Sequence, residues 1–191
     1  MSKILKKYSH KYEYLKLELE EMQEKFSSFE TEWKAIFGEY FNNIKNTVWI
    51  NEETGEIRNE PPTEETSSPP KPEKLKKLYR KTSVKAHPDK GGNDEDFDFI
   101  KKCYESNDML GLLSYASQNN IDFDIDEEDE ELLKQSVTGV ENKIKTLEIS
   151  LIWNFFKGNK RMKLAVIRQL EIEHDIKIDA DNILKKLESR N

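Results

Sequence analysis

The chain has 191 residues, of which 36% are charged and only 35% are apolar. Because so polar a composition cannot fill one thick globular core, we expect long, thin helical pieces with narrow apolar stripes. The formal net charge of -7 also excludes a protein that binds nucleic acid over its whole surface, since such proteins are basic.

Cys103 is the only cysteine in the chain. It permits neither an internal disulfide nor a metal cage built on thiolates, and the sequence predicts no metal and no cofactor. The amino-terminal stretch lacks the apolar core of a secretion signal, and no apolar run approaches the roughly 18 residues that span a bilayer. We therefore expect a cytoplasmic protein in a reducing compartment, without a membrane partner.

Residues 1–47 are expected to form a long coiled-coil-like helix. Their apolar residues recur at alternating steps of three and four over about five heptads, which is typical of a coiled coil. The helix can pair with its copy in a homodimer through residues 5–40, or fold back on helices of its own chain; we favour the dimer. Leu17 and Phe37 fall off the apolar seam. The seam comprises Leu5, Tyr8, Tyr12, Leu15, Leu19, Met22, Phe26, Phe29, Trp33, Ile36 and Tyr40.

Residues 48–71 are expected to form a turn followed by a linker. Glu53, Thr54 and Gly55 lie between two short extended pieces, which predicts a small hairpin. Five prolines occur from Pro61 to Pro72, too many for regular secondary structure.

Residues 72–118 have the pattern of a helical hairpin. The first helix should end at His87-Pro88-Asp89, because proline lacks an amide hydrogen and disfavours helical geometry in the residue before it, and a glycine pair follows. This helix is basic, with eight Lys and Arg against two acids between Lys71 and Lys90. Its apolar stripe comprises Leu75, Leu78, Tyr79, Thr82 and Ala86.

The second helix of this hairpin should be capped by Asn93 or Asp94, whose side chains can accept from free amides of the first turn. We expect a break or bend at Asn107 or Gly111. The apolar stripe comprises Phe97, Ile100, Cys103, Tyr104, Leu110 and Leu113.

Residues 119–131 are expected to form an acidic connector. Asp122, Asp124 and Asp126 have the opening spacing of a calcium loop, but the glycine and the final bidentate acid that such a loop needs are absent. We expect a solvated segment whose acids lie near the basic helix of the same chain.

Residues 132–191 are expected to form a C-terminal helical region. An apolar stripe from Leu132 to Phe156 predicts one helix, and residues 157–159 should end it. A further helix should follow, and Asp179 should cap a short last one.

No catalytic arrangement is recognisable. The three histidines, His10, His87 and His174, are far apart in the chain, and there is no glycine-rich phosphate loop or nucleophile elbow. His87 and Asp89 resemble an acid–base pair, but catalysis needs a pocket that holds substrate, and a helical tip offers little of one. The sequence therefore predicts a binding protein and not an enzyme.

The hairpin resembles the J domain of DnaJ-type co-chaperones. The second helix of that family runs approximately I-K-x-A-Y-R-x-L-A-L-x-Y-H-P-D-K and its third carries F-x-x-I-x-x-A-Y-E. The resemblance covers residues 72–116, about a quarter of the chain. The residues in register are Leu75, Lys76, Lys77, Leu78, Tyr79, Arg80, Lys81, Val84, Lys85, His87, Pro88, Asp89 and Lys90, then Phe97, Ile100, Tyr104 and Glu105, with Cys103 at the alanine.

The resemblance implies a co-chaperone that binds a DnaK-type chaperone and stimulates its ATP hydrolysis, while the flanking helices select client proteins. The carboxylate of Asp89 and the imidazole of His87 would engage the partner, and the cations would meet an acidic surface. The implied binding residues are His87, Pro88, Asp89, Lys90, Arg80, Lys77, Lys81, Lys85 and Tyr79.

The chain departs from the family before the hairpin, where a proline-rich stretch replaces the first J-domain helix. We expect N- or C-terminal helices to supply the missing apolar cover. The whole pattern predicts an all-α, elongated fold with a long N-terminal coiled-coil-like helix, a central J-like hairpin and a C-terminal helical segment. The alternatives are a helical scaffold with an inactive J-like hairpin, and nucleic-acid binding through the basic helix, against which the acidic total counts.

Overall fold

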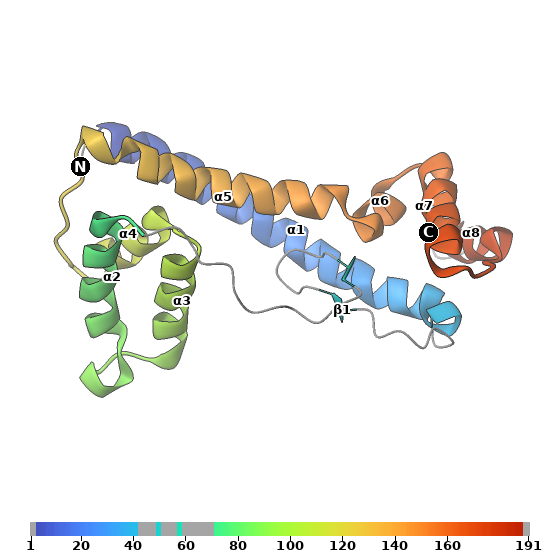
Figure 1. Cartoon of the computed structure of the whole chain (residues 1–191), viewed down its shortest axis with the longest axis horizontal. Helices are drawn as coiled ribbons and strands as arrows, with labels where there is room; N and C mark the ends of the chain where they lie inside the picture. The colour runs from blue at the N-terminus through green and yellow to red at the C-terminus, as the bar shows by residue number, and fades with distance from the viewer. Residues whose placement is uncertain (1–2, 42–48, 51–56, 59–70, 189–191) are drawn as a thin grey trace. The chain divides into compact units, whose positions relative to one another are not determined.

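The computed structural model describes residues 3–41, 49–50, 57–58 and 71–188, and it confirms the all-α class (Figure 1). These residues form eight α-helices and two short 3-10 turns, and the only strands among them are two of two residues each, which pair as a hairpin. The elements are α1 (Lys3–Phe41), β1 (Trp49–Ile50), β2 (Ile57–Arg58), α2 (Glu73–Ala86), η1 (Pro88–Lys90), α3 (Asp94–Glu105), α4 (Met109–Gln118), η2 (Glu127–Asp129), α5 (Glu130–Ile149), α6 (Leu151–Lys157), α7 (Lys160–His174) and α8 (Ala180–Glu188).

The chain divides into two compact units. Unit 1 consists of residues 1–19 and 64–142, and unit 2 consists of residues 20–63 and 143–191. Helices α1 and α5 each contribute residues to both units. The five sequence segments described above stay a prediction of domain organisation.

In unit 1, α2 and α3 lie side by side as a hairpin (Figure 1). Helix α2 follows Pro72 and carries Glu73 in its first turn, where an acid suits the helix dipole. Helix α3 is capped by Asn93, whose side chain accepts a hydrogen bond from the Asp96 amide at 2.7 Å. Four predicted core positions of α2 are confirmed as buried: Leu75, Leu78, Thr82 and Ala86.

The expected break in the second helix occurs at Asn107, which takes a left-handed φ of 57°. Asp108 then caps α4 by accepting from the Gly111 amide at 3.0 Å. Gly111 itself lies inside α4 and does not break the helix. A Cβ at Gly111 would approach the Cys103 sulfur to 2.6 Å, so glycine is needed there for close packing of α4 on α3.

The flanking segments of unit 1 contribute to the cover of the hairpin. The buried Tyr12 of α1 donates a hydrogen bond to the Asp108 carboxylate, and burial beside that charge raises the pKa of the phenol. From α5, the Ser136 hydroxyl accepts from the Leu110 amide at 3.1 Å. The two flanks also meet each other, since Tyr8 donates to Glu130 at 2.8 Å. Segments from both sides of the hairpin thus supply packing partners in unit 1.

The acidic connector lies on α2, as expected. The Lys74 ammonium forms ion pairs with Asp126 at 2.9 Å and with Asp129. Hydrogen bonding to Lys74 lowers the pKa of Asp126, and hydrogen bonding to Asp129 raises the pKa of Lys74. The connector is not solvated throughout, however, because Asp129 and Ile125 are buried.

The core of unit 2 joins α1 to the C-terminal helices. Phe37 has no exposed surface, although the heptad pattern left it off the seam. The seam prediction is wrong at this position because Phe37 belongs to one buried cluster with residues of α6, α7 and α8, which a heptad pattern for a single partner helix does not anticipate. Leu17, the other off-seam residue, is 63% exposed as expected. The buried cluster comprises Phe37, Phe155, Val166, Ile167, Leu170, Ile178 and Ile183.

The predicted helix from Leu132 to Phe156 is interrupted. Ser150 ends α5 and caps α6, since its hydroxyl accepts from the Trp153 amide at 3.2 Å. A serine inside an apolar stripe was the signal for this break. The last expected cap is confirmed, because Asp179 accepts from the Asn182 amide at 3.0 Å before α8.

The aromatic seam of α1 packs against helices of its own chain in unit 2. The Phe29 ring stacks on Phe156 at a centroid distance of 4.7 Å, and Trp33 meets Phe155 edge-on at 5.4 Å. These contacts are those of the fold-back alternative; self-association through residues 5–40 stays a prediction.

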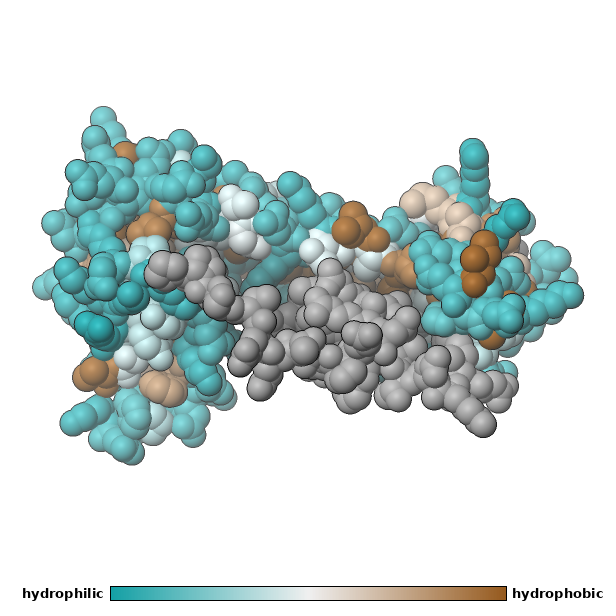
Figure 2. Space-filling view, viewed as in Figure 1, coloured by the Kyte–Doolittle hydropathy of each residue, from teal (hydrophilic) through white to brown (hydrophobic). Residues whose placement is uncertain are grey.

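A small hairpin is confirmed in unit 2, where Trp49 pairs with Arg58 and Ile50 with Ile57 in antiparallel register. Its predicted turn residues lie outside the described part of the chain. None of the described helices is both long enough and apolar enough to cross a membrane. On the face shown in Figure 2, hydrophilic residues cover most of the described surface, in keeping with the high charge content.

Candidate functional site

The tip of the unit 1 hairpin is an ordered turn. Helix α2 ends where His87 takes extended angles of φ -63° and ψ 131°, as expected for a residue that precedes proline. Pro88 to Lys90 form one 3-10 turn. The His87 carbonyl accepts two hydrogen bonds, from the Lys90 amide at 2.9 Å and from the Gly92 amide at 3.1 Å. The turn therefore closes back on the residue where the helix ends.

Each residue of the glycine pair has a separate role in this closure. Gly91 adopts a left-handed φ of 87°, which L side chains rarely adopt. Gly92 lies so close to the end of α2 that a Cβ there would stand 2.0 Å from the Ala86 carbonyl oxygen. Both glycines are thus required for the observed shape of the tip.

His87 and Asp89 interact within the turn. The Asp89 amide donates to Nδ1 of His87 at 3.2 Å. The imidazole meets the Phe97 ring edge-on at 5.2 Å. The Asp89 side chain is 85% exposed, with its Oδ2 atom 3.8 Å from Nδ1 of His87. The turn thus presents a carboxylate to solvent on a fixed backbone.

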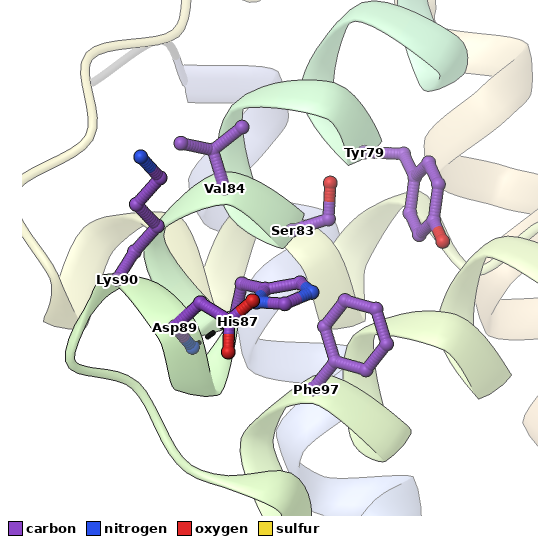
Figure 3. A pocket seen from close by; sticks show the side chains of 7 residues that line it. All are labelled: Tyr79, Ser83, Val84, His87, Asp89, Lys90 and Phe97. Atoms are coloured by element: carbon purple, nitrogen blue, oxygen red, sulfur yellow. Dashed lines mark hydrogen bonds and ion pairs between the residues drawn. The ribbon is translucent and has the colours of Figure 1, made fainter.

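An open hollow of about 330 Å³ adjoins the tip (Figure 3). The His87 ring lies between Ser83 and Phe97 in this view. Val84, on the outer side of α2, is 62% exposed although it is apolar. Tyr79 is held by stacking on Tyr104, with ring centroids 4.1 Å apart. The lining residues are Tyr79, Ser83, Val84, His87, Asp89, Lys90 and Phe97.

The structure brings four of the sequence-predicted residues together at the hollow, namely Tyr79, His87, Asp89 and Lys90. Pro88 belongs to the same turn. Sequence reasoning did not assign Ser83, Val84 or Phe97 to the site. For Val84 the signal was available, because an apolar residue among the lysines of a solvated helix face has no place in the core.

The eight cations from Lys71 to Lys90 fall into two groups. In the first, Lys71 donates to the Tyr104 carbonyl at 2.7 Å, and Lys81 donates to the Asp122 carbonyl at 2.9 Å and lies 5.6 Å from the Phe123 ring centre. Lys74 and Lys76 form ion pairs. The second group is exposed and forms no ion pair with any described residue. It comprises Lys77, Arg80, Lys85 and Lys90.

The arrangement suits recognition. Among the residues that the structure describes, no three His, Cys, Asp or Glu side chains gather in a way that could hold a metal ion. The hollow offers one carboxylate, one imidazole and an apolar wall beside unpaired cations. The carboxylate can bind a basic side chain, the apolar wall can bind an apolar side chain, and the cations can bind an acidic surface.

Comparisons with known proteins give partial matches. No family model matches the chain, and no solved structure matches it. Chaperone protein dnaJ 3 of Arabidopsis thaliana is 30% identical over 128 residues, which cover 63% of this chain and 28% of the relative. DnaJ protein homolog 2 of Allium porrum is 59% identical over 34 residues, covering 18% of this chain and 8% of the relative.

A third relative, chaperone protein dnaJ 2 of Arabidopsis thaliana, is 38% identical over 68 residues, covering 36% of this chain and 14% of the relative. The chain therefore spans less than a third of the length of these curated relatives. All three of these relatives are DnaJ-type chaperone proteins, so the chain contains a J-domain-like region related to them.

Proposed function

We propose that the J-domain-like region docks on a DnaK-type chaperone and stimulates its ATP hydrolysis through the tip His87-Pro88-Asp89. The observation that carries the proposal is the exposed Asp89 carboxylate on an ordered turn. The likeness to DnaJ-type proteins supports the choice of partner. The chain itself would catalyse no reaction.

The tip has the chemistry of a docking contact. An exposed carboxylate can accept a two-pronged, charge-assisted hydrogen bond from an arginine of the partner. The hydrogen bond from the Asp89 amide to the His87 ring holds the turn in one conformation, so little conformational entropy is lost on binding. His87 therefore positions Asp89, and Phe97 positions the His87 ring.

The unpaired cations complete the docking surface. Lys77, Arg80 and Val84 recur at helical spacing on one face of α2, and Lys85 and Lys90 lie nearer the tip. Exposed cations steer an acidic partner and increase its association rate. Lys81 already has partners in the acidic connector, so we expect it to contribute less than Arg80.

The remaining assignments are part of the same proposal. The helices outside the J-domain-like region would bind client proteins, or a second copy of the chain through residues 5–40. The protein would act in the reducing cytoplasm. Basic helix α2 would meet the chaperone and not nucleic acid.

The test is the single-turnover ATPase rate of a DnaK-type chaperone with and without this protein. Wild type should accelerate hydrolysis, and His87→Gln and Asp89→Asn should abolish the acceleration. Asp98→Asn is the matched control, because Asp98 is an exposed acid of the same hairpin that has no hydrogen bond or ion pair among the described residues; it should act as wild type.

The competing function is a helical scaffold whose J-like hairpin has lost co-chaperone activity. Two observations favour it: the hairpin packs against segments of α1 and α5, and a proline-rich stretch precedes it where the family has a helix. If wild type fails to accelerate hydrolysis, the docking proposal is wrong and the scaffold stands.

A further inference from the structure

A second basic segment lies in unit 2, far from the docking tip in the sequence. Between Ile149 and Leu170 there are five cations and no acid, in a chain whose net charge is -7. They occupy the end of α6 and the first half of α7. We call them the α7 basic surface. It comprises Lys157, Lys160, Arg161, Lys163 and Arg168.

The fold does not neutralise this surface. Four of its five side chains are exposed, and Lys163 is half-buried. None of the five forms an ion pair with any residue in the described part of the chain. The Lys157 ammonium lies 5.7 Å from the Phe29 ring centre and 5.8 Å from that of Trp153.

The position of two of these cations, Lys160 and Arg161, opposes helix stability. The amino-terminal end of a helix carries partial positive charge and favours acids. Helices α2, α3, α5 and α8 each carry acids in their first turn, whereas α7, like α1, α4 and α6, has none there and begins with Lys160 and Arg161. Like charges at the most positive end of α7 thus raise the free energy of this unit, so a role in folding does not explain them.

The turn before α7 holds the cations close together. Gly158 packs so tightly that a Cβ would lie 2.3 Å from the Asn154 carbonyl oxygen. Asn159 caps α7 by accepting from the Met162 amide at 3.0 Å. Only these two residues separate Lys157, the last residue of α6, from Lys160, the first residue of α7. Figure 1 shows α7 following directly on α6.

We propose that the α7 basic surface binds the phosphate backbone of a nucleic acid, without reading its sequence. Arg161 and Arg168 are seven residues apart on one face of α7, or about 10 Å along the helix axis. Phosphates of one DNA strand rise about 3.4 Å each along the duplex axis, so the two arginines span about three phosphates. The free amides at the start of α7 add donors of the kind that bind phosphate.

The surroundings count against a lipid surface. Among the α7 cations the large exposed apolar side chains, Met162 and Leu164, are only 42% and 40% exposed, and the most exposed ones of unit 2, Ile149 and Ile172, lie outside the surface. These two isoleucines adjoin Glu148, Glu171 and Glu173 in the chain, whose charges an anionic bilayer repels. The negative total of the chain excludes binding over its whole surface but leaves this local contact, which is expected to be weak and strongly salt-dependent.

The experiment titrates full-length protein into a fluorescein-labelled DNA duplex of random sequence and into a labelled single-stranded RNA, over a range of salt concentrations. Lys160, Arg161 and Arg168 lie within about 100° of one another around α7, and three phosphate contacts predict a slope of log K against log salt of about -2.7 on duplex DNA. The triple variant Lys160→Gln, Arg161→Gln, Lys163→Gln should reduce this slope to about -0.9 and weaken binding in low salt at least about tenfold.

The matched control, Lys145→Gln, Lys177→Gln, Lys185→Gln, removes the same charge from exposed lysines elsewhere in unit 2 and should bind within about twofold of wild type. The proposal is wrong if wild type fails to bind either nucleic acid, or if both triple variants lose the same affinity. It is also wrong if the protein binds phosphatidylserine vesicles or polyglutamate but no nucleic acid. Asp89→Asn should bind nucleic acid as wild type does, which separates this test from that of the docking tip.

Discussion

The two basic segments of the molecule differ in how their charges fit the helix dipole and in whether acids of the chain neutralise them. Helix α2 begins with Glu73 and has Lys85 in its last turn, so its charges agree with the helix dipole. Part of its positive charge is neutralised by the connector through Lys74. Helix α7 begins with cations and has no such neutralisation among the described residues. A count of local charges therefore does not identify a binding surface. The charges that stay unpaired after folding do.

The largest expected effect comes from a substitution in the core of unit 2, which supports α7. Phe37→Ala removes a ring with no exposed surface from the unit 2 core and should lower the free energy of unfolding by about 3–5 kcal/mol. Leu17→Ala, at a 63% exposed position of the same helix, should cost at most about 0.5 kcal/mol. Urea unfolding measures both values.

Hydrogen exchange of Phe37→Ala then tests whether the two units are separate. Amides of α7 and α8 should lose protection, while those of α2 and α3 keep it. Equal loss in all four helices would show that unit 1 has no stability of its own.

The next effect concerns the docking tip. Gly92→Ala places a Cβ against the Ala86 carbonyl oxygen and should lower the free energy of unfolding by about 2–3 kcal/mol. It should also abolish the stimulation of the chaperone. Gly139→Ala is the control in α5, where nothing lies within 4 Å of the added Cβ. That substitution should raise the free energy of unfolding by about 0.5–1 kcal/mol, because alanine favours a helix. A stable Gly92→Ala variant with full stimulation would contradict the closed turn.

A smaller effect should follow when the ion pairs between the acidic connector and α2 are removed. Lys74→Met leaves the buried Asp129 carboxylate without its ion pair and should cost about 1–3 kcal/mol. Lys76→Met is the control, since its partner Glu73 is exposed and such pairs contribute about 0.5 kcal/mol or less. Equal costs would mean that the connector adds nothing to the stability of α2.

The same contact makes stability depend on pH. The pKa of Asp126 is lowered in the folded state, so its contribution is complete above the ordinary aspartate pKa of about 4 and is lost as the pH falls through the lower folded value. The pKa of Lys74 is raised, so its contribution is complete below about 10.5 and is lost as the pH rises through the higher folded value. In Lys74→Met the acid-side loss should therefore be smaller, as unfolding at pH values on both sides of 4 can show.

Local features of the hairpin were predictable from the sequence, and its wider supports were not. The end of α2 at His87, the cap at Asn93 and the buried face through Leu78 follow from proline chemistry, side-chain acceptors and helical period. The burial of Phe37 depends on helices more than a hundred residues later in the chain. A heptad pattern predicts only the face that contacts a single partner helix. The choice of Lys74 over Lys77 as the paired cation likewise depends on where the connector runs.

The smallest expected effect tests the comparison most directly. Lys160→Glu places an acid in the first turn of α7 and should raise the free energy of unfolding by about 0.3–1 kcal/mol, because the helix dipole favours it. Glu73→Lys makes the opposite change in the first turn of α2 and should lower the free energy of unfolding by a similar amount. Low salt should enlarge both effects and high salt should reduce them, since the charges are exposed. Lys160→Glu should at the same time weaken nucleic-acid binding, so that stability and affinity change in opposite directions. If the substitution destabilises unit 2 instead, Lys160 has a structural role, and the argument that the fold leaves this charge unused is wrong.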